Sequence, residues 1–398
     1  MGNVDRVFGS TNLVGDQSKN TAFVTHYGQL EIAEHRADIL CRFEYNNSAK
    51  DVTITTTGTG ASSNANSMAI ASTGAGVGLS RFQSVRTNTY RPAHECKAVM
   101  SVTFSTASAN TNQRAGIYDA QDGFFFGYSG ATFGVTIRKG GSDTFIAQSS
   151  WNKDKLDGTG NSKFNIDPTK SNQYLINYGW LGVAPITFMV YGGEDKGWIP
   201  CHVYDITNIA TTPTILSPSL PISWEAERTS GSGAITVSVG SIFAGRAAAH
   251  SHAGHRSFCG KATKTLVAGV ETYIATFINN STFQSKTNKV RIVASYVGCA
   301  SDGTKSVEFL FHKNATITGA SYVAIDANNS VTSYDVSGSY TGGSLELDIP
   351  LAKVDNTSLI LDEYIHLELL PGETMTISGL SAGASDVIIT FRWEEYFA

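Results

Sequence analysis

Short runs in which apolar and polar residues alternate recur along the chain, whereas helical periodicity is nearly absent. FGVTIR (133–138) and SLELDI (344–349) follow this pattern, and in DVIITFRW every second residue is apolar: Val387, Ile389, Phe391 and Trp393. Successive side chains of a strand point to opposite faces, so the pattern predicts half-buried strands. Turn clusters such as DGT, NNS, TGG and PGE separate the runs. We therefore predict an all-β protein built from antiparallel β-sandwich or jelly-roll-like domains, with an extended N-terminal segment.

The composition excludes some partners. Charged residues make up 16% of the chain, below the usual quarter, and 39 glycines accompany many Thr, Ser and Asn residues. The net charge of −5 and the absence of a Lys/Arg cluster argue against nucleic-acid binding. No apolar run reaches the length that spans a bilayer, so we expect no membrane partner.

The five cysteines are scattered without CxxC spacing, and the N-terminal residues resemble no secretory signal. We therefore expect free thiols and a reducing compartment, such as the cytoplasm of a host cell.

The length of 398 residues predicts more than one domain. We place an N-terminal arm with strands and a flexible loop at 1–80, which could belong to the first domain. A central β-sandwich follows at 81–256 and a C-terminal β-sandwich at 257–398. Residues 55–80 are a low-complexity stretch that we interpret as a long loop or arm.

The stretch WNKDKLDGTGNS is the densest group of charged and turn-forming residues. A regular calcium loop is excluded, because Asp157 stands where the loop glycine belongs and Lys163 replaces the final glutamate. A looser calcium site stays open, and Asp154 and Asp157 are too close in sequence for a typical glycosidase pair. The preferred interpretation is a structural or interface turn in which side-chain oxygens accept backbone N–H groups. Its residues are Trp151, Asn152, Asp154, Asp157, Gly158 and Gly160.

The histidine cluster His250, His252 and His255 has the spacing H-x-H-x-x-H. Imidazoles bind zinc, iron, copper or nickel, and three chains of a trimer would bring several copies around one axis. The alternative is a solvated Gly/Ala-rich linker. A shared metal site in an oligomer is the sharper hypothesis, and no other cofactor is expected.

Two further patterns bear on catalysis and on sugar binding. GLSAG at 379–383 matches the G-x-S-x-G nucleophile motif, but a strand pattern follows it and no histidine lies beyond Ser381. We interpret it as a hairpin turn and predict no enzyme activity. The aromatic run of DGFFFGYSG is more typical of a core than of a sugar-binding platform, although a carbohydrate contact stays open.

Residues 80–245 resemble virion-associated structural proteins of tailed bacteriophages and some large DNA viruses. The resemblance rests on the order GFFFGYSG, WNKDKLDGTGNS, GWLGV and a segment ending in Leu-Pro. Ala184-Pro185, where relatives tend to have a glycine-containing step, and the histidine cluster depart from the family pattern. The resemblance implies no catalytic residues.

These observations lead to the hypothesis of a non-enzymatic virion structural protein that assembles in the host cytoplasm. It would act in a head decoration, neck, tail or baseplate fibre through interfaces with other virion proteins, as a homo-oligomer such as a trimer. The alternative is an adhesin that binds a host receptor or a surface glycan, and a glycan depolymerase is the third possibility.

Overall fold

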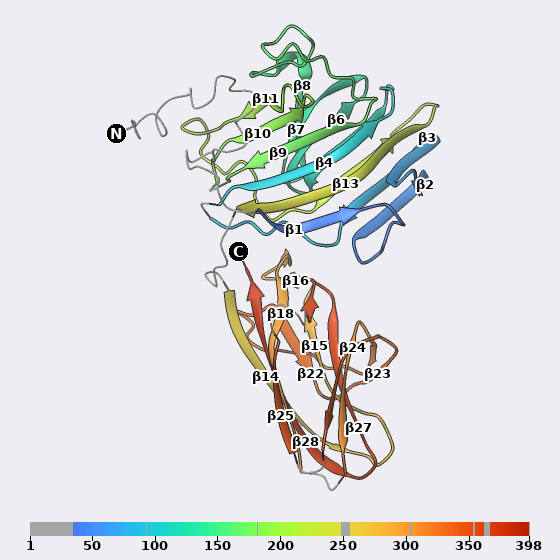
Figure 1. Cartoon of the computed structure of the whole chain (residues 1–398), viewed down its shortest axis with the longest axis vertical. Helices are drawn as coiled ribbons and strands as arrows, with labels where there is room; N and C mark the ends of the chain where they lie inside the picture. Colours follow the sequence, from blue (N-terminus) through green and yellow to red (C-terminus); the bar gives the residue numbers. More distant parts are fainter. Residues whose placement is uncertain are drawn as a thin grey trace. The chain divides into compact units, whose positions relative to one another are not determined.

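The computed structural model describes residues 35–92, 94–180, 182–247, 255–302, 305–352, 355–361 and 367–397. The chain divides into two compact units, residues 1–251 and residues 252–398. This division lies a few residues before the one predicted from the sequence, because strand β14 (His255–Leu266) belongs to the second unit. Figure 1 shows antiparallel strands in both units, which confirms the predicted all-β class. Among the described residues, no helix is long and apolar enough to cross a membrane.

Thirteen described strands of the first unit belong to one curled sheet, in the order β11-β10-β9-β4-β13-β3-β12-β5-β6-β7-β8, with β1 on β13 and β2 on β3. Their bounds are β1 His35–Arg42, β2 Val52–Ala65, β3 Met68–Ser84, β4 Cys96–Phe104, β5 Thr111–Tyr118, β6 Gly123–Ser129, β7 Thr132–Lys139, β8 Ser142–Ala147, β9 Asn172–Tyr178, β10 Ile186–Tyr191, β11 Trp198–Tyr204, β12 Ile222–Arg228 and β13 Ile235–Ala247. A short 3₁₀ helix follows β8 at Gln148–Ser150.

The two halves of this sheet pack against each other through aromatic side chains. Phe126 of β6 contacts Tyr174 of β9, with ring centroids 4.8 Å apart, and Phe188 of β10 at 5.3 Å. All three rings are buried in one hydrophobic core. The run GFFFGYS therefore belongs mainly to the interior, as the core interpretation predicted, because Phe124 and Phe126 face inward.

The predicted loop over residues 55–80 is wrong, because these residues form most of the long β2–β3 hairpin. Residues 69–73 of β3 pair with β13 and residues 78–83 pair with β12, so β3 contributes to both halves of the sheet. Buried residues alternate along β3, but the alternation changes phase between Thr73 and Gly78. Glycines permit this irregularity: a Cβ at Gly60 would lie 1.8 Å from the carbonyl oxygen of Leu79. The small Thr, Ser and Gly residues give no strong hydrophobic alternation. The sequence pattern therefore does not indicate the strand β3, which pairs with both halves of the sheet.

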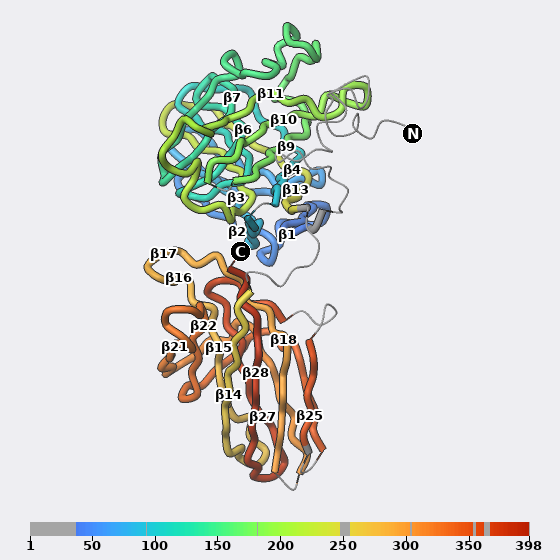
Figure 2. The backbone as a smooth tube through the Cα atoms, turned by 90° about the vertical axis from the view of Figure 1, so that its left-hand side faces the viewer, coloured from blue at the N-terminus to red at the C-terminus, as the bar shows by residue number. Residues whose placement is uncertain are grey.

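The second unit is a sandwich of two antiparallel sheets, β14-β28-β18-β25 with β26 and β21-β22-β15-β27-β19-β24. The strands β14, β28, β18 and β25 run side by side along the unit (Figure 2). The bounds after β14 are β15 Thr272–Asn279, β16 Thr282–Phe283, β17 Lys286–Thr287, β18 Arg291–Ser301, β19 Val307–Lys313, β20 Thr316–Thr318, β21 Val323–Ala324, β22 Thr332–Asp335, β23 Ser339–Thr341, β24 Ser344–Leu351, β25 Asp355–Ile360, β26 Glu368–Leu369, β27 Thr374–Ser381 and β28 Ser385–Tyr396.

The motif GLSAG does not form the predicted hairpin. β27 ends at Ser381 and β28 begins at Ser385, but the two strands lie in different sheets. The motif therefore comprises the end of β27 and the first two residues of a connection between layers. The Ser381 hydroxyl donates to the carbonyl oxygen of Ser306 at 3.1 Å and is buried, which is a structural contact.

Candidate functional site

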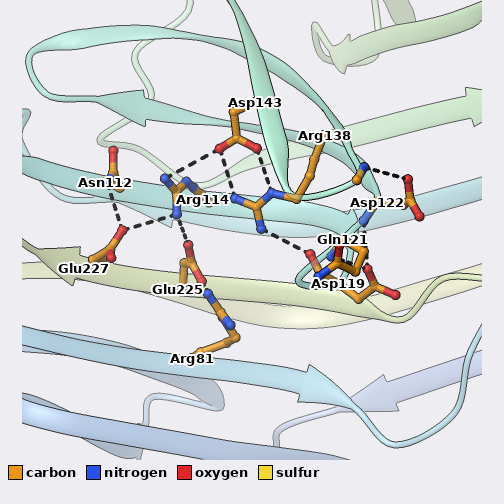
Figure 3. Close-up of polar contacts among 11 residues, drawn as sticks. Arg81, Asn112, Arg114, Asp119, Gln121, Asp122, Arg138, Asp143, Glu225 and Glu227 are labelled. Carbon is orange, nitrogen blue, oxygen red and sulfur yellow. Dashed lines mark hydrogen bonds and ion pairs between the residues drawn. The ribbon is translucent and has the colours of Figure 1, made fainter. Parts of the chain in front are cut away.

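Charged side chains gather on the face of β3, β12, β5, β6, β7 and β8 that points away from the core, called the outer face here. On β12, Trp224 and Ala226 enter the core, so Glu225 and Glu227 project from the other side. Cross-strand pairing extends this row, because Glu225 lies opposite Arg81 of β3 and Arg114 of β5. The outer-face network, drawn in Figure 3 with neighbouring residues, consists of Arg81, Arg114, Arg138, Asp143, Glu225 and Glu227.

Glu225 is the buried centre of the network. Its side chain is fully enclosed, and it forms ion pairs with both Arg81 and Arg114. Burial raises the pKa of Glu225, but the two guanidinium groups outweigh burial and hold the pKa below its ordinary value. Glu225 therefore stays ionised at neutral pH.

Arg114 joins this centre to the exposed rim. It lies 3.3 Å from Glu227 Oε2 and 3.8 Å from Asp143 Oδ2, and both of these carboxylates are about one-third exposed. Burial opposes the charged form of Arg114, but Glu225 raises its pKa above the ordinary value. The guanidinium group is thus a fixed positive charge between three carboxylates.

Arg138 is also paired with a carboxylate, and its guanidinium group lies beside two aromatic rings. Its Nε and Nη2 donate to the two carboxylate oxygens of Asp143 at 2.7 and 3.0 Å. The guanidinium carbon lies 5.2 Å from the ring centroid of Phe125 and 5.5 Å from that of Tyr118. Such bidentate and cation–π contacts hold the planar group rigidly.

A small hollow lies beside Arg114. Gly127 and Gly134 are cross-strand partners next to Arg114, so no side chain fills this part of the outer face. The ring of Phe145 lies over Gly134, because a Cβ at Gly134 would lie 2.7 Å from Phe145 Cζ. The outer-face hollow has a volume of about 50 Å³, room for three or four water molecules, and its walls include Asn112, Arg114, Gly127, Thr136, Asp143 and Phe145.

Enclosure and ion pairing distinguish Glu225 from the carboxylates of a glycosidase pair. A glycosidase pair requires one carboxylic acid that protonates the leaving group and a second carboxylate that reaches the sugar. Glu225 is enclosed and its pKa is lowered, so it fits neither role. The hollow instead offers an aromatic ring, a carboxylate and a guanidinium group within a concave surface.

The WNKDKLDGTGNS residues form a loop that packs on β11. Trp151 is buried against Phe126 and Phe133, with ring centroids 6.4 and 6.1 Å apart. The Asn152 side chain makes two hydrogen bonds to the backbone of Val203, one donated at 2.8 Å and one accepted at 2.9 Å. These contacts fix the start of the loop on the sheet.

Two aspartates bind backbone groups within this loop. Asp154 is buried and accepts N–H groups from Leu156 at 2.9 Å and from Ser162 at 2.8 Å. Gly160 leaves room for it, because a Cβ there would lie 2.1 Å from Asp154 Oδ1.

Asp157 is exposed and accepts both the N–H and the hydroxyl of Thr159, which lowers its pKa. Gly158 has a φ of 83° and donates its N–H to Phe164. The geometry is that of a hydrogen-bonded turn, and the contact with a neighbouring subunit stays a prediction.

The histidine cluster is described only in part, because His250 and His252 lie outside the described residues. His255 begins β14, with Nδ1 3.2 Å from Glu394 Oε2 and its ring centroid 3.8 Å from that of Tyr396. Within the described ranges, no group of three or more His, Cys, Asp or Glu side chains is arranged to hold a metal ion. The shared metal site stays a prediction.

The sequence reasoning missed the outer-face network. One signal was present: WEAER places two glutamates two residues apart, alternating with Trp224 and Ala226. That spacing predicts a strand with an acidic outer side. The partners of the glutamates come from β3 and β5, and only the strand register reveals them.

No protein-family model matches the chain, and no curated protein sequence matches it significantly. Solved structures with some similarity include the cellulose induced protein Cip1, with 14% identity and a TM-score of 0.36 over 52% of this chain and 96% of that chain. The Crh5 transglycosylase has 9% identity and a TM-score of 0.37, over 53% and 87% of the two chains. The CBM2 module of the Lactobacillus casei BL23 phage J-1 evolved Dit has 12% identity and a TM-score of 0.34, over 55% and 100%. At these values, the likeness assigns no function to the chain.

Proposed function

We propose that the chain is a non-enzymatic binding protein whose first unit contacts a glycan through the outer-face hollow. The supporting observation is the outer-face hollow beside Arg114, whose walls include the ring of Phe145 and the polar groups of Asp143 and Asn112. A sugar has apolar C–H faces and a rim of hydroxyl groups, so it matches one aromatic side chain flanked by fixed hydrogen-bonding partners.

The charges of the network favour a neutral sugar. Three arginines and three carboxylates balance one another, and each arginine is already paired with a carboxylate. An anionic ligand would have to compete with these carboxylates for the same guanidinium groups. A hydroxyl group accepts and donates hydrogen bonds at the rim without disturbing the ion pairs.

A glycan array with the purified full chain tests the proposal, followed by titration of the sugars that bind. Phe145→Ala removes the ring, and we expect the affinity to fall about tenfold, the size of one aromatic contact. Tyr45→Ala is the matched control, because Tyr45 is 80% exposed and lies outside the hollow. A blank array, or equal affinity of the Phe145→Ala variant and the wild type, would refute the proposal.

We also propose a second function, assembly as a virion structural protein, on a different observation. β2 pairs only with β3 among the described residues, and residues 52–70 contain no Asp, Glu, Lys, Arg or Pro. Soluble proteins usually protect such an edge with charge or proline, because its free backbone groups attract other strands. A neutral edge of this length suits pairing with another virion subunit.

Sedimentation of the wild type and of a Thr55→Lys/Thr57→Lys variant tests this second function. Both threonines are exposed on β2, so we expect the wild type to self-associate and the variant to sediment as a monomer. Thr211→Lys, in an exposed loop, controls for the added charge. A wild type that stays monomeric at high concentration and is absent from washed particles contradicts the assembly role.

A further inference from the structure

Arg228, the last residue of β12, is a buried cation that has no acidic partner among the described residues. Only 1% of its surface is exposed, and it points to the core side of the sheet together with Trp224 and Ala226. Its Nη1 donates a hydrogen bond to the carbonyl oxygen of Ser230 at 3.3 Å. Arginine stays protonated in proteins, and a buried charge is costly unless it is paired.

The unpaired atoms of Arg228 form one edge of the guanidinium group. Nε and Nη2 are both buried, and neither has a hydrogen-bond partner among the described residues. These two N–H groups point in parallel and match the two oxygens of a carboxylate, phosphate or sulfate. By contrast, Nη1 of Arg246 donates to both Asp38 and Thr89, and Arg246 therefore has an acidic partner.

Further donors lie near Arg228 on the same side of the sheet. Arg228 is the cross-strand partner of Gly78, which has no side chain, and Ser80 follows on the same face of β3. The Ser80 hydroxyl is buried and has no partner among the described residues. The place beside Gly78 is taken by Thr59 of β2, because a Cβ at Gly78 would lie 2.5 Å from the Thr59 hydroxyl oxygen.

A short exposed loop follows Arg228 at the end of β12. Residues 229–234 are all exposed, and Gly231 and Gly233 adopt φ values of 86° and 106°. A Cβ on these glycines would lie 3.6 Å from Nη1 and 3.8 Å from Nη2 of Arg228, so the loop passes directly beside the guanidinium group. Because the loop buries little surface, its opening costs little and gives access to Arg228.

We propose that Arg228 is the anchor of an oxyanion-binding site beneath the 229–234 loop. The ligand is a carboxylate or a tetrahedral oxyanion such as sulfate or phosphate, held by Nε and Nη2 with the Ser80 hydroxyl nearby. The site lies on the core side of β12 and is separate from the outer-face hollow, so it stands independently of the proposed glycan contact.

Thermal unfolding of the full chain in millimolar sulfate, phosphate or acetate tests this site, with chloride at equal ionic strength as the reference. Tryptophan fluorescence reports mainly on the first unit, which holds Trp151, Trp180, Trp198 and Trp224 of the five tryptophans. We expect Tm to rise by about 5 °C at a hundredfold excess over Kd. A rise of Tm in acetate indicates a carboxylate ligand, and a rise of Tm in sulfate or phosphate indicates a tetrahedral oxyanion. Either result supports the site.

Two variants make the test specific. Arg228→Lys keeps the charge but cannot make the bidentate contact, so we expect at least a tenfold weaker affinity. Arg228→Met removes the charge and should abolish the oxyanion effect. Arg42→Met is the control, because the Arg42 side chain is 76% exposed. Equal Tm in all salts overturns the proposal, and a rise that is undiminished in Arg228→Met indicates an adventitious ion only.

Discussion

Arg114 and Glu225 lie directly opposite each other on β5 and β12, and they form an ion pair on the side of the sheet that faces away from the core. Arg81 pairs with the same carboxylate from β3. Three strands that are distant in sequence thus meet at one enclosed negative charge, which links the outer-face network to the stability of the first unit.

Glu225→Gln is expected to destabilise the first unit by about 3 kcal/mol, because it leaves two guanidinium groups without their shared buried counter-charge. Urea unfolding followed by tryptophan fluorescence measures the change. Glu227→Gln is the matched control, since Glu227 is 32% exposed. This variant should lower the free energy of unfolding by less than about 1 kcal/mol. Similar losses for both variants would contradict the central role of Glu225.

Asp154→Ala is expected to lower the stability of the first unit by about 2 kcal/mol, because it removes the acceptor of two backbone N–H groups in a buried loop. Asp157→Ala should leave Tm almost unchanged, since Asp157 is exposed and, within the described ranges, its side chain bonds only Thr159. Thermal unfolding of both variants separates the aspartates. If Asp157→Ala is the more damaging variant, the described loop geometry is incorrect.

Acid is expected to destabilise the second unit through Asp335. Burial raises the pKa of Asp335, but hydrogen bonds from Ser337, Ser321, Tyr273 and Gly338 outweigh it and hold the pKa well below the ordinary 3.8. A carboxyl whose folded pKa is depressed adds stability above its unfolded pKa, and this stability disappears as the pH falls toward the folded pKa.

Scanning calorimetry between pH 2.5 and 7 measures this effect. Tm of the second unit should fall as the pH drops below about 4, and Asp335→Asn should lower Tm at neutral pH while weakening the acid dependence. An unchanged acid dependence in that variant would assign the effect to other carboxyls.

Gly60→Ala tests the long hairpin that replaced the predicted loop. A Cβ at Gly60 would lie 1.8 Å from the carbonyl oxygen of Leu79, so β2 must separate from β3 at this point. We expect a loss of about 2 kcal/mol or more in urea unfolding. Gly74→Ala is the control, because its Cβ would meet only ordinary contacts at 3.6 Å or more. Tolerance of Gly60→Ala would show that the hairpin pairs differently.

Strands with large alternating side chains could be predicted directly. In β28, Val387, Ile389, Phe391 and Trp393 are all buried, as the alternation indicated. β3 could not be recognised in this way, because its inward residues include Ala69, Ala71 and Thr73, whose small side chains give no hydrophobic contrast. The phase change near its glycines removes the remaining periodic signal.

The candidate site was less accessible to sequence reasoning than the strands. The turn chemistry of Asp154 is local, since its partners lie within eight residues, and the sequence indicated this type of contact. Arg81, Arg114 and Glu225 come from three strands, and their meeting depends on a register that no local pattern encodes. Nε and Nη2 of Arg228 have no hydrogen-bond partner among the described residues. This property likewise depends on the whole fold, because it is set by which side chains the other strands place beside Arg228.

The pairing of β13 has a consequence for synthesis on the ribosome. β13 is the last strand of the first unit, yet it pairs with β1, β3 and β4. None of these early strands can complete its pairing until its partner residues in β13 have left the ribosome, and the synthesis of about 200 intervening residues takes roughly 10 to 40 s at ordinary elongation rates. During that interval, the nascent chain carries several open strand edges. Early binding by chaperones is therefore expected for this chain.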